Sequence, residues 1–169
     1  MPLAPSLFVS HGAPTFALAQ SAPARALRAF GASQPRPDAV MVVSAHWQTP
    51  GLRVQSAARP STLHDFGGFP EALYRLQYPA PGAPALAAEV RDLLIAAGLP
   101  AELDANRGFD HGAWVPLLHL LPEAEVPVLQ VSLPQSAGPA LAHRLGQALR
   151  PLRSRGVWVL GSGSLTHNL

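Results

Sequence analysis

The feature that most constrains the fold of this chain is a set of short, continuous apolar runs. They lie at roughly residues 5–10, 39–45, 127–133 and 156–161. Runs that do not alternate with polar residues suit strands that are buried on both faces of a parallel sheet. Stretches with helical patterns lie between them, at residues 22–30, 83–97 and 137–152. This order predicts an α/β fold with a largely parallel central sheet and helices on both faces.

The composition favours one compact domain. Of the 169 residues, 48% are hydrophobic and 13% are charged, which provides a sizeable core and argues against a disordered chain. Prolines and glycines cluster between the predicted elements, so we expect a single domain over residues 1–169. The region 50–82 is long, aromatic and rich in glycine, which is typical of a binding loop.

Charge and residue usage exclude several classes of partner. All 12 basic residues are arginines, the formal net charge is +2, and the arginines form no basic stripe, so we predict no nucleic-acid partner. No segment approaches ~18 uninterrupted apolar residues, and no basic region precedes the N-terminal apolar stretch. We therefore predict no membrane partner and a cytoplasmic location. Because the chain has no cysteine, a metal would be held by nitrogen and oxygen ligands.

Three histidines follow predicted strands. His11 and His46 are 35 residues apart, which fits one βαβ unit, and His167 follows the last apolar run. The parallel strands of such a unit end at the same edge of the sheet, where open α/β sheets bind ligands. Neutral imidazoles without cysteine suit zinc or non-haem iron(II). We therefore predict a metal site at the carboxyl edge, with the alternative that all three histidines only bond loop backbone.

Two further histidines stand beside carboxylates, in the pairs His64–Asp65 and Asp110–His111. A carboxylate can hold a metal-bound imidazole by a hydrogen bond to its other ring nitrogen. Asp110 has a second interpretation, because it precedes an apolar stretch and can cap a helix there. The remaining two histidines lie within predicted helices, and we interpret them as structural: His119 and His143.

Other catalytic motifs are incomplete. The stretch GSGSLT lacks the third glycine of a dinucleotide-binding loop, and no G-x-S-x-G motif supports a serine hydrolase. A zinc-dependent hydrolase remains an alternative only because histidine-rich zinc sites are common, since the H-E-x-x-H spacing is missing.

The chain resembles the 4,5-DOPA extradiol dioxygenase family in five motifs, which occur in this order along its whole length: SHGAPTF, VVSAHW, HDFGGFPEALYRLQYPAPG, GFDHGAWVPL and SGSLTHNL. This family belongs to the class III extradiol ring-cleavage dioxygenases and is related to the catalytic subunit of protocatechuate 4,5-dioxygenase. The resemblance implies that the chain opens a DOPA-like catechol with O2. It also implies one non-haem metal ion per chain, Fe(II) for catalysis or Zn(II) as isolated.

The resemblance further implies a role for each of five histidines. It makes His11 and His46 metal ligands and His167 the acid–base group near the substrate. It makes His111 a second catalytic residue, which contacts the substrate or supports a ligand, and it makes His64 a candidate for substrate binding.

Family members continue beyond the motif that reads THNL here, and their further segment carries a third metal-binding histidine. Because this sequence ends at Leu169, the resemblance implies that the chain lacks this C-terminal segment. A metal-binding homologue without activity is therefore the alternative to an active dioxygenase. Loss of the segment would also uncover an apolar surface, which would favour self-association.

Overall fold

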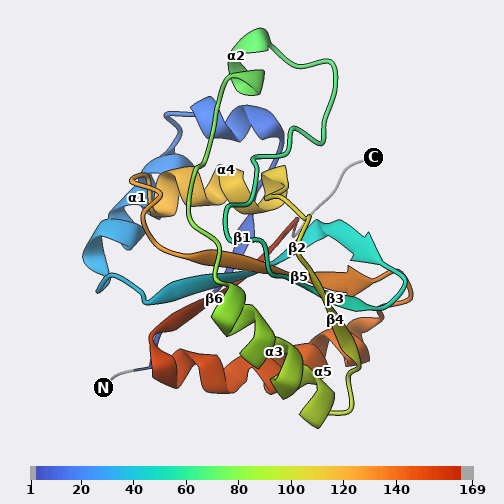
Figure 1. Cartoon of the computed structure of the whole chain (residues 1–169). Helices are drawn as coiled ribbons and strands as arrows, with labels where there is room; N and C mark the ends of the chain where they lie inside the picture. The colour runs from blue at the N-terminus through green and yellow to red at the C-terminus, as the bar shows by residue number, and fades with distance from the viewer. Residues whose placement is uncertain (1–2, 165–169) are drawn as a thin grey trace.

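A computed structural model describes residues 3–164 as a six-stranded sheet between two layers of helices (Figure 1). The strands are β1 (Ser6–Ser10), β2 (Ala39–Thr49), β3 (Leu52–Gln55), β4 (Ala101–Asp104), β5 (Val128–Pro134) and β6 (Val157–Gly163). Their order in the sheet is β1-β6-β2-β5-β3-β4. Every neighbouring pair is parallel except β3 with β5, which confirms the predicted largely parallel sheet.

Helices cover both faces of the sheet, as predicted. They are η1 (Pro14–Leu18), α1 (Ala22–Ser33), α2 (Glu71–Tyr74), α3 (Pro84–Ala96), α4 (His111–Leu120), α5 (Pro139–Leu149) and η2 (Arg150–Arg155). Helices α1 and α4 pack together on one face, and α3 and α5 pack together on the other (Figure 1). In residues 3–164, no helix has the length and apolar character needed to cross a membrane.

The apolar run of β2 is continuous because both faces of this strand are buried. Val40 and Val42 pack in the core beneath α4, whereas Ala39 and Met41 pack in the core beneath α3 and α5. Successive side chains of a strand point to opposite faces, so a strand covered on both sides needs apolar residues at every position.

Strand β2 does not end where the sequence predicts. It continues to Thr49, and its pairing with β5 shifts register between Val43 and Gln48. His46 therefore lies inside the strand, within the irregular stretch, rather than after it. The prediction was wrong because an irregularity in the pairing breaks the simple pattern of strand and loop, and such irregularities commonly redirect side chains near functional sites.

Two short strands and one helix end also differ from expectation. The four-residue strand β3 lies in the region interpreted as a binding loop, and the four-residue β4 was not predicted, because such short runs carry little periodic signal. The helix predicted over 137–152 ends at Leu149 and continues as η2, which contains Pro151. Proline at this position has no N–H to donate to an α-helical bond.

Candidate metal centre

Three imidazoles meet at the carboxyl edge of the sheet: those of His11, His46 and His111. One ring nitrogen from each lies within 4.8 Å of the others, so the group can hold a metal ion. The Nε2 atoms of His11 and His46 are 2.8 Å apart, which confirms that these two residues lie side by side. The ring centroids of His46 and His111 are 3.9 Å apart. His11 and His111 are buried, whereas His46 is exposed and marks the open side of the group.

Each histidine of this triad comes from a different kind of backbone. His11 directly follows β1 and precedes Gly12, whose φ of 65° turns the chain away from the sheet. His46 lies in the irregular part of β2, and His111 is the first residue of α4. The sheet and the helix that covers it therefore aim their side chains at one point.

The pKa values of two of these imidazoles, those of His11 and of the partly solvent-exposed His46, are lowered, so both are neutral at pH 7. Burial, followed by repulsion from the neighbouring His46 and His111, lowers the pKa of His11 to about 4. Burial and then His111 also lower the pKa of His46. A neutral imidazole has a ring nitrogen with a free lone pair, which is the form that binds metal ions.

The two buried histidines have partners at their Nδ1 atoms. Nδ1 of His11 is 2.9 Å from the hydroxyl oxygen of Ser162. Nδ1 of His111 is 3.0 Å from Oδ1 of Asp65, which is a close contact but outside hydrogen-bond geometry. The same carboxylate oxygen accepts the backbone N–H of His111 at 2.9 Å. Burial alone would raise the pKa of Asp65, but its interactions with His111 outweigh burial and lower it to about 2.

Asp110 is buried beneath the triad and anchors several side chains. Its carboxylate accepts hydrogen bonds from Ser44 Oγ at 2.6 Å, Gln130 Nε2 at 2.8 Å and Arg107 at 2.9 Å. Ser44 Oγ in turn accepts the backbone N–H of His46 at 3.2 Å. Although Asp110 occupies the N-cap position of α4, its side chain makes no capping bond within residues 3–164. The helix-cap interpretation of its carboxylate is therefore wrong, because side-chain donors take its oxygens instead.

An aromatic cluster from the region 50–82 lies beside the triad, with Phe66 at its centre. The Phe66 ring centroid is 5.7 Å from that of His111 and 5.8 Å from that of His64. Nε2 of His64 donates to the carbonyl of Leu76 at 3.0 Å, which fixes this imidazole within the cluster rather than in the triad. The other rings in contact with Phe66 are those of Phe69, Tyr74 and Trp114.

The remaining histidines lie away from the triad or outside the described structure. His119 is buried and contacts the carbonyl oxygen of Phe16 through Nε2 at 2.8 Å, which supports a structural role. His143 lies exposed on α5, where its Nε2 contacts Gln147 at 3.4 Å. His167 lies outside residues 3–164, so its predicted acid–base role stays a prediction.

Sequence reasoning missed the polar residues that support the triad from within the strands. Ser44 and Ser162 face each other across β2 and β6, and Gln130 lies on β5. All three are buried. A polar residue inside an otherwise apolar run was the available signal, because buried polar groups require partners.

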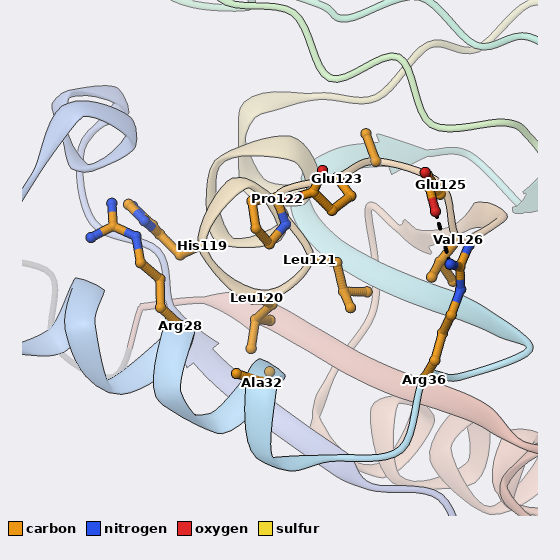
Figure 2. A pocket seen from close by; sticks show the side chains of 12 residues that line it. Arg28, Ala32, Arg36, His119, Leu120, Leu121, Pro122, Glu123, Glu125 and Val126 are labelled. Carbon is orange, nitrogen blue, oxygen red and sulfur yellow. Dashed lines mark hydrogen bonds and ion pairs between the residues drawn. The ribbon is translucent and has the colours of Figure 1, made fainter.

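A separate cavity of about 410 Å³ lies between α1 and the end of α4. Figure 2 shows Arg28 and His119 at one end of it and the ion pair of Arg36 with Glu125 at the other. Its remaining lining residues are Gly31, Ala32, Leu120, Leu121, Pro122, Glu123, Ala124 and Val126.

Comparison with known proteins identifies the family of this fold and site. Residues 6–169 match the family described as the catalytic LigB subunit of aromatic ring-opening dioxygenase. The chain belongs to this family. The match confirms the predicted resemblance and gives the zinc-hydrolase alternative no support.

Named relatives and one solved structure agree with this membership of the LigB family. The chain is 44% identical to a 4,5-DOPA dioxygenase extradiol of Escherichia coli (strain K12), covering 98% of this chain and 60% of that protein. It is 42% identical to one of Beta vulgaris, covering 96% and 62%. A crystal structure of an uncharacterized Escherichia coli K12 protein matches with a TM-score of 0.79 at 38% identity, covering 96% of this chain and 61% of that one. The chain thus spans about three fifths of these relatives.

Proposed function

We propose that this chain provides the metal- and substrate-binding part of an extradiol dioxygenase that opens a DOPA-like catechol with O2. The observation that carries the proposal is the triad of His11, His46 and His111 beside an aromatic cluster. The family and the names of its relatives support the reaction and an aromatic substrate.

His11 and His46 are the proposed metal ligands, with Fe(II) as the ion for ring cleavage and Zn(II) as an ion that the same nitrogen ligands accept. Their Nε2 atoms face each other at 2.8 Å, and the lowered pKa of each keeps the imidazole neutral. When bound, the ion supplies Lewis-acid chemistry toward the catechol oxygens and, as Fe(II), redox chemistry toward O2.

His111 is the proposed catalytic residue on the substrate side of the triad. Because Asp65 lies against Nδ1, the Nε2 atom of His111 is left to face the ligand and to exchange a proton with a catechol hydroxyl. One ring nitrogen of His111 is also close enough to those of His11 and His46 to hold the ion with them. Metal content of His111→Ala separates these roles, because loss of a ligand lowers occupancy, whereas loss of a proton carrier lowers turnover alone.

The aromatic cluster is the proposed wall of the catechol site. Phe66 contacts His111 edge to face, with an interplanar angle of 88°, and aromatic rings also attract a catechol ring through offset or edge contacts. His64 is held behind Phe66 by the carbonyl of Leu76. We propose that His64 forms part of this wall and contributes to substrate binding there. His167 remains the proposed second acid–base group.

Anaerobic reconstitution tests the proposed function. The protein is loaded with Fe(II), its iron content is measured, and L-DOPA and then O2 are added. Ring opening should produce a yellow semialdehyde that is followed by absorbance. His46→Ala should produce none, whereas His143→Ala, on the exposed face of α5, should behave as the wild type does.

Full iron occupancy without any absorbance change, for L-DOPA and for simpler catechols, would show that the chain binds metal without this activity. Failure to retain iron or zinc would instead contradict the proposed metal site.

A further inference from the structure

We propose that Ser162 is a positioning residue that determines which ring nitrogen of His11 carries the hydrogen. Pro116 makes this possible, because it leaves the Gly112 carbonyl free to accept the Ser162 hydrogen. The proposal rests on the proposed metal site, because it explains how the Nε2 lone pair of His11 is directed toward an ion.

The Ser162 hydroxyl has a single hydrogen to donate. Its oxygen lies 2.9 Å from Nδ1 of His11 and also contacts the backbone carbonyl of Gly112. A carbonyl oxygen only accepts, so the hydroxyl hydrogen points to Gly112. The contact with His11 then requires a hydrogen on Nδ1, because the hydroxyl has no second hydrogen to donate.

Pro116 explains why the Gly112 carbonyl takes this hydrogen. In an α-helix the carbonyl of residue 112 would accept the N–H of residue 116, but residue 116 is a proline within α4 and has no N–H. A buried carbonyl without a partner is costly, so a donor from outside the helix is favoured. Ser162, on the strand beneath α4, supplies it.

Gly112 allows the helix to come close enough for this contact. A Cβ atom at Gly112 would lie 2.3 Å from Ser44 Oγ and 3.0 Å from the ring of His46. The first distance is shorter than packing allows and the second is tight, so glycine favours this approach of α4 to the strand ends. Ser162 and Ser44 are paired in the register of β6 and β2, which places both hydroxyls beneath the helix.

With its hydrogen on Nδ1, His11 has a lone pair on Nε2. Because this atom lies 2.8 Å from Nε2 of His46, the hydrogen between the two rings belongs to His46. The two proposed ligands are therefore unequal. His11 is already in the tautomer that binds an ion through Nε2, whereas His46 must first move its hydrogen.

Nitrogen-15 NMR of the histidine side chains tests this inference independently of any bound metal. In the chelator-treated wild type at pH 8, His11 should show a hydrogen on Nδ1, with its signals assigned by their loss in His11→Gln. Ser162→Ala should show a mixture of Nδ1–H and Nε2–H forms. Ser132→Ala, a matched change at a buried strand serine that bonds Thr49 and Arg53, should leave the His11 pattern unchanged. A wild-type His11 with its hydrogen on Nε2 would overturn the proposal.

Zinc affinity, measured by competition with a chromophoric chelator, gives a second readout. Ser162→Ala should bind zinc roughly 10- to 100-fold more weakly, the usual loss for a residue that orients a metal ligand, and Ser132→Ala should bind it normally. Equal affinity of Ser162→Ala and the wild type would contradict the role of Ser162 while leaving the proposed metal site intact. A wild type that binds no zinc would contradict the metal site, and the NMR result would still decide the tautomer.

Pro116→Ala provides a variant for the case in which Ser162→Ala does not fold. It gives Gly112 a helical N–H and frees the Ser162 hydrogen to turn toward Nδ1. A fraction of Nε2–H should then appear at His11, and an unchanged pattern would overturn the role of Pro116.

Discussion

The two buried histidines of the triad are supported in different ways. His11 is backed by a neutral hydroxyl from strand β6, which is 3% exposed, whereas His111 is backed by a charged carboxylate from the region 50–82, whose side chain is 28% exposed. We call the first set of residues the sheet half of the site (His11, Ser44, His46 and Ser162) and the second the loop half (His64, Asp65, Phe66 and His111). Under the roles proposed above, the sheet half holds the ion and the loop half acts on the substrate.

The largest expected effect is the loss of metal binding on damage to the sheet half. His11→Ala should weaken zinc binding by roughly 10²- to 10⁴-fold, because structural zinc sites gain ~10 to 16 kcal/mol from all their ligands together. Chelator competition measures this change, with His143→Ala as the matched control. Undiminished zinc affinity in His11→Ala would place the ion elsewhere.

Acid should separate the two halves by the pH at which each loses stability. The folded pKa of His11 is about 4, against 6.5 for an ordinary imidazole, so between these values the unfolded chain binds a proton that the folded chain does not. The free energy of unfolding of the chelator-treated protein should fall by up to about 3 kcal/mol as the pH drops from 6.5 to 4.

Asp65, the carboxylate of the loop half, should respond below this range. The pKa of Asp65 is lowered from 3.8 to about 2, so the stability that its carboxylate provides is lost as the pH falls between those two values. Urea unfolding across the pH range measures both losses. His11→Gln should flatten the curve between pH 6.5 and 4, and an equally steep curve in this variant would assign that loss to other groups.

Asp65→Asn should damage the loop half without damaging the sheet half. Catechol turnover should fall roughly 10- to 100-fold, because His111 loses the charge that orients its ring, while zinc affinity stays close to that of the wild type. Steady-state kinetics of the Fe(II)-loaded protein and chelator competition test the two statements. Asp92→Asn, on the surface of α3, is the control. A loss of zinc affinity as large as that of His11→Ala would remove the distinction between the halves.

The smallest expected effect is on substrate affinity. Phe66→Ala removes one aromatic contact beside His111 and should weaken catechol binding to the zinc-loaded protein about 2- to 10-fold, which corresponds to ~0.5 to 1.5 kcal/mol. Calorimetric titration measures it. Phe69→Ala, which changes a ring in contact with Phe66, should have less effect. An equal or larger effect of Phe69→Ala would move the proposed catechol site away from His111.

The two histidines of the sheet half were predictable from the sequence, because their signals are local and periodic, whereas its two serines were missed. Continuous apolar runs identify strands buried on both faces, and the spacing of His11 and His46 matches one βαβ unit. The irregularity in pairing that carries His46 inside β2 was not predictable, because it depends on how β5 pairs with both parts of that strand.

The loop half and the supporting residues depend on contacts between segments that are distant in sequence. Asp65 and His111 come from two different histidine–carboxylate pairs, and neither pair indicates that these two members meet. Similarly, the role of Ser162 depends on a carbonyl that is left unpaired by a proline elsewhere in the chain. Such contacts are set by tertiary packing rather than by local propensity.

The position of β1 at the edge of the sheet has a consequence for the motion of the protein. Within residues 3–164, β1 pairs only with β6, whereas β2 lies in the middle of the sheet between β6 and β5. A strand that is paired on one side only opens more readily than one paired on both sides, so His11 sits at the end of a strand that is prone to local opening. An ion bound by both His11 and His46 would connect β1 to β2 across the intervening strand β6. It would tie this outer strand to the centre of the sheet and slow amide hydrogen exchange along β1 more than along β2.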